Sequence, residues 1–382
     1  MPVATLRTRS AAGVSAVLLA IGLTACAEET PAATDDGTGP VAVTAGDSEC
    51  KLSRAEVLAG TSTFSVTNGG SKVTEFYVYA EGDRVMGEVE NIGPGLKRDL
   101  IVELEAGKYQ TACKPGMVGN GIRGDLTVSG EAAKQVDSDA ALKQATVSYQ
   151  RYVNSQATAL EERTVEFVTA VKANDIAKAK QLFGVNRTYW ERIEPVAESF
   201  GDLDPKIDGR ENDVEPGKDF TGWHRIEKAL WVDNSTAGMA KYADMLLADV
   251  KTVVAKAKAV QLNPLQLANG AKELLDEVAT GKITGEEDRY SHTDLWDFAA
   301  NVEGSQAAIA ALRPVLEDRD PELLQTIDQR FADVEALLAA QQTETGYTYY
   351  DDLTEPEIQA MADAISALGE PVSQVAAVVA GQ

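Results

Sequence analysis

Residues 354–368 read Thr-Glu-Pro-Glu-Ile-Gln-Ala-Met-Ala-Asp-Ala-Ile-Ser-Ala-Leu, and this stretch holds both the start signal and the apolar face of a helix. Thr354 and Glu357 have the spacing of a capping box, in which each side chain bonds to the backbone N–H of the other residue. Pro356 falls in the first turn, where a missing N–H is tolerated. The apolar side chains then recur at helical spacing, at Ile358, Met361, Ile365 and Leu368. The stretch therefore predicts an amphipathic helix packed against other helices.

Two further stretches have the same character. Asp320-Pro321 opens a helix whose apolar positions are Leu324, Ile327, Phe331, Val334 and Leu338. A third stripe consists of Met239, Tyr242, Met245, Leu246, Val250 and Val253. Such stripes indicate core packing, so we expect residues 138–382 to form an all-α helical bundle.

Before Gly130 the apolar residues recur at every second position instead of at helical spacing. Short alternating runs occur at 63–66, 75–79, 99–104 and 125–128, and Gly- and Asn-rich turn signals separate them. Several short strands at close spacing predict a small β-sandwich over residues 47–130. The fold class is therefore multidomain, with a β-sandwich followed by an all-α bundle.

The N-terminus has the features of a secretion signal. Arg7 and Arg9 precede an apolar run, residues 11–23, that is too short to span a membrane. We predict a signal peptide over residues 1–25 and lipidation at Cys26, because Leu-Thr-Ala-Cys resembles a bacterial lipobox. The alternative is a plain signal peptide that leaves Cys26 free. Residues 26–46 lack periodicity and predict a flexible linker to the membrane.

Charge narrows the class of partner. The 382-residue chain has a formal net charge of −25. A nucleic-acid partner is excluded, since its phosphates would be repelled. Cationic ligands such as metal ions are compatible with this charge, although acidic residues also serve simply to keep a secreted protein soluble.

Histidine is scarce, and this limits the chemistry. The chain contains two histidines, His224 and His292, and neither has a nucleophile motif nearby. We expect a structural role for His292 at a helix start. The sequence also has no Walker A loop, no G-x-G-x-x-G motif and no C-x-x-C pair.

His224 and Glu227 lie three residues apart in what we predict to be the start of a helix, so both can face one ion. Glu191 and Glu194 show the same spacing, which we interpret as a second helix. Between Glu191 and Glu227 there are eleven acidic and five basic residues. Paired ligands on facing helices are how carboxylate metal sites are built in bundles. The alternative is an acidic helix face in solvent.

The ligand types also favour particular metals. One imidazole with several carboxylates suits iron, manganese or zinc better than Cu(I).

Three segments carry a resemblance to a known family. Residues 191–198, 222–227 and 285–294 look like motifs of the imelysin (M75) domain of EfeO-type iron-uptake proteins, and the match runs from about Ala140 to the C-terminus. The resemblance implies a metal site at the His-x-x-Glu motif. By position, its ligands would be His224, Glu227, Glu191, Glu194, Asp208 and Glu287. It also implies a cupredoxin-like N-terminal domain.

The function that follows is capture of iron, as Fe2+ or Fe3+, outside the cytoplasm, with zinc or copper as alternative ions. The resemblance implies a lipid-anchored or periplasmic protein that hands its ion to a membrane permease and works beside a haem peroxidase. We therefore expect a metal-binding transport component rather than an enzyme.

Other functions compete with this one. A ferroxidase is one alternative, because carboxylates favour Fe3+. An M75-type metallopeptidase is less favoured, because an inverted zincin needs H-x-x-E-H and position 228 is Lys. A sugar-binding module could use Trp190, Trp223 and Trp231, although such residues are more often core.

Residues 41–130 contain no histidine, so a blue-copper centre is excluded there. Cys50 and Cys113 remain. Outside the cytoplasm such a pair favours a disulfide. The resemblance implies the alternative, a second metal site formed by Cys50, Glu75 and Cys113.

Overall fold

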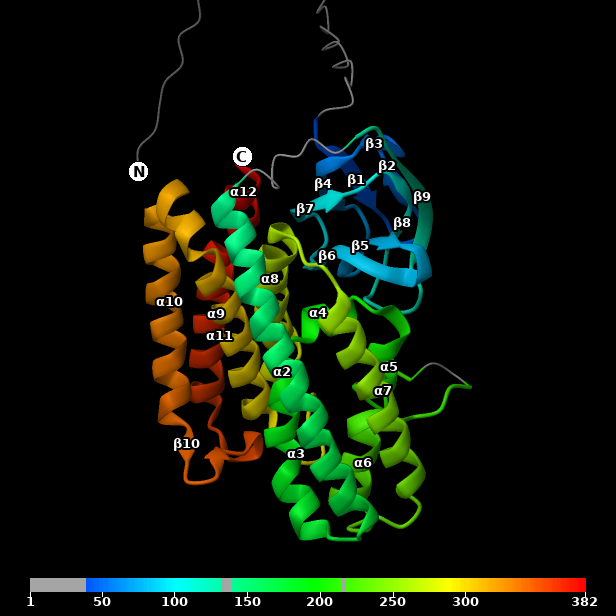
Figure 1. Ribbon diagram of the computed structural model, residues 1–382, viewed down its shortest axis with the longest axis vertical. Coiled ribbons are helices and arrows are strands. Elements are labelled where there is room, and N and C mark those ends of the chain that lie inside the picture. The colour runs from blue at the N-terminus through cyan, green and yellow to red at the C-terminus, as the bar shows by residue number, and fades with distance from the viewer. Residues whose placement is uncertain (1–38, 132–138, 215–216) are drawn as a thin grey trace, which may run out of the picture. The chain divides into compact units, whose positions relative to one another are not determined.

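The computed structural model describes residues 39–131, 139–214 and 217–382. Strands occupy the described chain up to Ser129, and helices dominate from Ala140 onward (Figure 1). A β-sandwich followed by a helical domain is the predicted fold class, which is confirmed. The predicted signal peptide, residues 1–25, and Cys26 lie outside the described residues.

The N-terminal region is a sandwich of two sheets. The four-stranded sheet has the order β2 (Cys50–Leu52), β1 (Val41–Ala45), β4 (Gly60–Asn68) and β7 (Lys97–Leu104). The five-stranded sheet has the order β3 (Glu56–Leu58), β9 (Ile122–Ser129), β8 (Gly107–Cys113), β5 (Thr74–Ala80) and β6 (Arg84–Ile92). Strand pairs are antiparallel except β1 with β4 and β3 with β9. Alternate residues fill the core, where Phe64 and Phe76 pack with ring centroids 5.5 Å apart.

One predicted boundary is wrong. Residues 41–45, assigned to the flexible linker 26–46, form strand β1, which pairs in parallel with β4 so that Val43 lies opposite Val66. Val41, Val43 and Ala45 are buried and the two residues between them are exposed. This short alternation is a strand signal, so the sandwich begins before residue 47.

The helical region contains long helices that run side by side, together with several short ones (Figure 1). The long helices are α2 (Ala140–Lys172), α3 (Ile176–Glu191), α7 (Ala240–Ala259), α8 (Pro264–Thr280), α9 (Asp294–Arg319), α10 (Pro321–Ala340) and α11 (Glu355–Val372). The shorter ones are α4 (Glu194–Glu198), α5 (Asp204–Ile207), α6 (Gly222–Trp231) and α12 (Val375–Ala380), with 3-10 turns at Gly201–Leu203, Lys282–Thr284 and Tyr350–Asp352. A two-residue hairpin of β10 (Gln342–Thr343) and β11 (Gly346–Tyr347) joins α10 to α11 and was not predicted.

The predicted helix starts are confirmed. In the capping box of α11, the Thr354 N–H and hydroxyl donate to Glu357 Oε2 at 2.8 and 2.6 Å. Asp320 caps α10 by accepting from Leu323 N–H at 2.9 Å. The predicted apolar stripes are buried or half-buried in one core with the other helices, except for Met245, which is half-buried outside that core.

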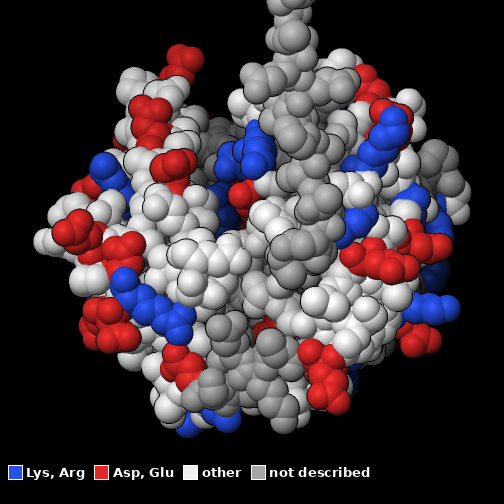
Figure 2. Space-filling model, turned by 90° about the horizontal axis from the view of Figure 1, so that it is seen from above, with Lys and Arg blue, Asp and Glu red and all other residues white. Residues whose placement is uncertain are grey.

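On the face shown in Figure 2, acidic and basic side chains are interspersed among neutral ones. Within the described ranges, no helix combines the length and the apolarity that crossing a membrane requires.

Candidate metal centre

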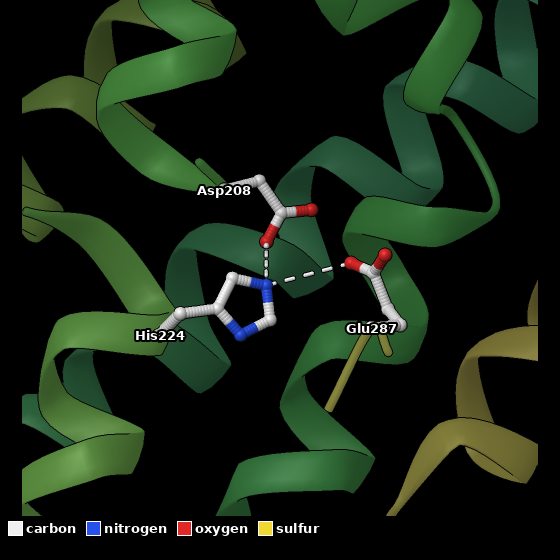
Figure 3. Close-up of side chains that lie close together, drawn as sticks. All are labelled: Asp208, His224 and Glu287. Carbon is white, nitrogen blue, oxygen red and sulfur yellow. Dashed lines mark ion pairs between the residues drawn. The ribbon is translucent and has the colours of Figure 1, made fainter. Parts of the chain in front are cut away.

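Three separate segments meet at His224 (Figure 3). His224 lies in the first turn of α6, Asp208 directly follows α5, and Glu287 lies in the loop before α9. His224 Nε2 is 3.4 Å from Asp208 Oδ1 and 3.4 Å from Glu287 Oε1. All three side chains are buried, and that of His224 is 1% exposed. One imidazole and two carboxylates therefore point toward one small volume.

A glycine allows this approach. Gly222, the first residue of α6, has a φ of 76°, which favours glycine. A Cβ at this position would lie 2.1 Å from the carbonyl oxygen of Ile207. Because glycine lacks that atom, the start of α6 can lie against the end of α5. This places His224 beside Asp208.

The other imidazole nitrogen is bound to Glu227. His224 Nδ1 lies 2.8 Å from Glu227 Oε2. Glu227 Oε1 accepts hydrogen bonds from Tyr290 N–H at 3.0 Å, from Ser291 N–H at 2.8 Å and from the Ser291 hydroxyl at 2.9 Å. A carboxylate held in this way fixes the ring orientation of a metal-binding histidine and leaves the other nitrogen for the metal.

A buried arginine holds the acidic side chains together. The Arg187 guanidinium, fully buried, donates to Asp208, to Glu191 at 2.5 Å, to Glu287 at 2.9 Å and to Asp297 at 3.1 Å. Its planar fork of donors suits several carboxylates at once. Arg187 therefore orients the same two carboxylates, Asp208 and Glu287, that face His224.

Two of the carboxyl groups are kept ionised. Burial acts to raise the pKa of Asp208, but Arg187 and His224 outweigh it and hold the pKa at about 2. Burial also acts to raise the pKa of Glu287. Lys282, His224 and Arg187 outweigh it and hold that pKa well below its usual range. Burial and Arg187 act to lower the pKa of His224, but Asp208, Glu227 and Glu287 raise it well above its usual value. A metal at Nε2 would thus replace a proton.

Other buried acids surround this group. Burial raises the pKa of Asp288 to about 8 and that of Asp294 to about 6. Oδ1 of Asp288, Oδ2 of Asp294 and Oδ1 of Asp297 have no hydrogen-bond partner, and neither has His224 Nε2. Buried polar atoms are normally paired. Of these carboxylate oxygens, Asp288 Oδ1 lies 3.9 Å from His224 Nδ1, while Asp297 is bound through its other oxygen to Arg187.

In the described part of the chain, three groups of side chains have ligand atoms close enough to hold one metal ion. They are Asp208 with His224 and Glu287, His224 with Glu227 and Asp288, and Glu191 with Glu194 and Asp208. The structure thus gathers all six residues predicted as ligands into adjoining groups. Glu287 is buried while its neighbour Glu286 is exposed, and Asp208 Oδ1 lies 3.4 Å from His224 Nε2.

The placement of Glu191 and Glu194 on one helix is wrong. Glu191 ends α3 and Glu194 begins α4, with a turn between them. Pro195 lacks the N–H that would bond to the Glu191 carbonyl in a continuous helix. The Asn301 amide donates to that carbonyl instead, at 2.9 Å.

Several site residues were missed. Arg187, Lys282, Asp288, Asp297 and Asn301 contribute to the cluster, and each is fully or almost fully buried. Asp288 alone had a signal in the sequence, because it is the last of three consecutive acids that begin at Glu286.

The predicted site in the sandwich has a different outcome. Cys50 in β2 and Cys113 in β8 form a disulfide that joins the two sheets, with Cα atoms 5.6 Å apart. Cys113 lies opposite Phe76 and shares its core face, so the neighbouring Glu75 points to the other face. There Glu75 Oε2 lies 3.7 Å from Lys114 Nζ. In this disulfide-bonded form the cysteines and Glu75 do not make one site.

The structure also shows the surroundings of the three tryptophans, of His292 and of Lys228. Trp190 and Trp223 are fully buried, so they cannot stack on a sugar, and Trp231 packs against the core. His292 lies just before α9, with Nε2 3.2 Å from Asp351. Lys228, in place of the second zincin histidine, binds Glu211 at 2.6 Å.

Comparison with known proteins gives a consistent result. Residues 145–375 match the imelysin (peptidase M75) family, and residues 15–128 match a cupredoxin-like domain. The iron uptake system component EfeO of Escherichia coli O1:K1 / APEC is 43% identical over 345 residues, which cover 89% of this chain and 91% of that protein. The EfeO proteins of Escherichia coli K12 and of Shigella flexneri are each 42% identical over the same shares.

Proposed function

The chain belongs to the EfeO family of iron uptake system components, with a cupredoxin-like and an imelysin domain, and on this basis we propose that it captures iron at His224. The ligands would be His224 Nε2, Asp208 and Glu287. The observation that carries the proposal is a buried imidazole nitrogen without a hydrogen-bond partner, 3.4 Å from each of two carboxylates that are kept ionised.

Glu227 has a separate role in this proposal. Its carboxylate holds the His224 ring through Nδ1, and the backbone around Ser291 holds the carboxylate. It is therefore an orienting residue. Asp288 lies 3.9 Å from the same nitrogen, on the Glu227 side of the ring.

Glu191 and Glu194 would belong to the surroundings of the ion rather than to its ligands. Both carboxylates are bound to Lys282, at 3.1 Å each.

The donor set accounts for the choice of ion. One nitrogen and several carboxylate oxygens suit Fe2+, Fe3+, Mn2+ or Zn2+. The family supports iron as the cargo, and zinc is the principal competitor. Copper would need the sulfur or additional imidazole donors that the centre does not offer.

The place and partners are also part of the proposal. The protein would work at the extracytoplasmic face of the membrane, anchored through Cys26 after removal of residues 1–25, or as a periplasmic protein. It would pass its iron to a membrane permease beside a haem peroxidase. The sandwich, from β1 to β9, and the helical domain, residues 138–382, would be its two working parts.

Substitution of the histidine tests the site. His224→Ala should weaken iron binding by more than the roughly 10–100-fold that loss of an orienting partner costs, because a ligand itself is removed. Calorimetry and elemental analysis would measure affinity and stoichiometry. His292→Ala is the matched control, since that side chain is 34% exposed and paired with Asp351. Unchanged iron stoichiometry in a folded His224→Ala variant would rule the site out.

A ferroxidase activity is the second candidate. It is favoured by the ionised state of Asp208 and Glu287, since anionic oxygen donors stabilise Fe3+ over Fe2+. In air-saturated buffer, where O2 accepts the electrons from Fe2+, oxidation no faster with the wild-type protein than without it would remove this candidate and leave iron capture standing.

A further inference from the structure

The buried lysine of the cluster occupies a place suited to a metal ion. Lys282 lies in the 3-10 turn after α8, and its side chain is 1% exposed. Its Nζ is 3.1 Å from Glu191 Oε2, 3.1 Å from Glu194 Oε2 and 3.5 Å from Glu277 Oε2. Lysine is almost never fully buried unless it is paired. Here its ammonium group is the cation inside a pocket of carboxylates.

Two of the three carboxylates around Lys282, those of Glu191 and Glu194, also belong to a possible ligand set. Ligand oxygens of Glu191, Glu194 and Asp208 lie within 4.8 Å of one another, and all three residues are buried. These are oxygen donors of the kind that Mn2+ and Fe2+ accept.

Asn301 gives an independent indication that a ligand fits there. Its side chain is fully buried, and its Nδ2 donates to Glu191 Oε2 at 3.2 Å and to Glu194 Oε2 at 3.1 Å. Its Oδ1 has no hydrogen-bond partner. Rotation of the amide by half a turn would direct this unpaired oxygen at the same two carboxylates, at the cost of the hydrogen bond from Nδ2 to the Glu191 carbonyl oxygen. It would then be a fourth oxygen donor.

The pocket adjoins the proposed iron site. Asp208 is a member of both groups, the one with His224 and the one with Glu191 and Glu194. Two ions would therefore share a carboxylate, as in the two-metal centres of helical bundles. An ammonium group fixed in one of the two places repels a second ion.

From this arrangement, and resting on the proposed iron site, we propose that Lys282 is an internal counter-ion that fills a second metal pocket and limits the centre to one ion. Lys282 is then a specificity-determining residue. The bundle holds a single ion for transfer rather than a pair of ions.

The test is metal stoichiometry in the full mature chain with Mn2+ as the probe. Wild-type protein should bind one ion at the centre, and Lys282→Gln should bind two, with a spin-coupled signal in electron paramagnetic resonance. Lys282→Arg keeps the charge and should bind one ion. Lys272→Gln is the matched control, because Lys272 is 18% exposed and pairs only with Asp276 among the hydrogen bonds and ion pairs described. Binding of one ion by Lys282→Gln, or of two by either control, would overturn the proposal.

Double variants separate this proposal from the function itself. Lys282→Gln with His224→Ala should bind one ion in the emptied pocket, and further change of Glu194→Gln should abolish it. An ion in the double variant supports the pocket whether or not His224 proves to bind iron. Absence of that ion contradicts the proposal, while loss of iron in His224→Ala alone would still support the proposed function.

Folding of the variant gives a second measurement. Lys282→Gln leaves buried carboxylates without their cation, and Mn2+ should take its place. Mn2+ should therefore raise the melting temperature of Lys282→Gln more than that of Lys272→Gln. If Lys282→Gln is unfolded without metal, Mn2+ should restore its helical circular dichroism. No extra stabilisation and no restoration would each count against the proposal.

Discussion

The sandwich and the helical domain both bury polar side chains, but they balance them differently. In the sandwich, Cys50 and Cys113 are joined in a disulfide, and Glu75 is matched by Lys114. Around His224, buried carboxylates outnumber the buried cations Arg187 and Lys282, and carboxylate oxygens of Asp288, Asp294 and Asp297 lack hydrogen-bond partners.

A buried polar atom without a hydrogen-bond partner opposes folding, because it has given up its hydrogen bonds to water. The two regions differ in charge: the cysteine pair of the sandwich is closed by a covalent bond, while the helical centre gathers several acidic side chains around two buried cations, which fits the proposed cation site. The tests of this comparison substitute a residue in one region and measure the stability or the metal binding of the protein.

The largest effect should follow removal of the buried arginine. Arg187→Met leaves several carboxylates without their cation, so unfolding of the helical domain should become easier by about 3–5 kcal/mol. Urea denaturation followed by circular dichroism would measure the change. Arg313→Met is the control, since its pair with Asp328 is exposed and should contribute about 0–1 kcal/mol. Equal effects in the two variants would mean that Arg187 does not balance the cluster.

The next effect concerns the sandwich alone. Cys50→Ser should lower its stability by about 2–4 kcal/mol, because the disulfide that constrains the unfolded chain is lost. Iron binding at His224 should be unchanged. Thermal unfolding and calorimetric titration with iron would measure the two quantities. A large loss of iron binding would contradict the expectation that iron binding does not depend on the disulfide of the sandwich.

A smaller change should follow neutralisation of the orienting carboxylate. Glu227→Gln keeps a hydrogen-bonding side chain beside His224 Nδ1 but removes its charge, so iron affinity should fall about 10–100-fold. The number of ions bound should stay the same, which calorimetry would show. Complete loss of the ion would instead make Glu227 a ligand.

The smallest effect should be a gradual dependence on pH. The pKa values of Asp204 and Asp288 are raised by burial to about 8, from an ordinary value of 3.8. Groups with raised pKa values bind more protons in the folded state, so their contribution to stability is present at low pH and lost as pH rises toward 8. The free energy of unfolding of the metal-free protein should therefore decline between about pH 5 and 8.

Metal provides the contrast in that experiment. Chemical denaturation at several pH values, with and without Zn2+, should show that the ion reduces the decline. The same decline with saturating Zn2+ would contradict a cation site in the cluster.

The sequence by itself determined the two-part fold class and the placement of His224 and Glu227 on one face of a helix. Thr354 and Glu357 marked a helix start, and His224 and Glu227 were placed on one face, because these relationships depend on residues three apart. Helix geometry sets such distances without reference to the rest of the chain. The alternation that predicts strands is local in the same way, and it extends to β1, where the predicted boundary was set too late.

Only the tertiary structure decided which cations balance the buried acidic side chains of the site. Arg187 meets Asp208, Glu287 and Asp297 across 21, 100 and 110 positions of sequence, and no local pattern marks an arginine for that place. It also decided that Glu287 rather than Glu286 is buried and that Nδ1 of His224 is held while Nε2 faces the acids. The buried Lys282 is paired with Glu191 and Glu194 for the same reason. The physical reason is that the state of a buried charge depends on which distant charges share its low-dielectric surroundings, and the packing of the helices alone sets that.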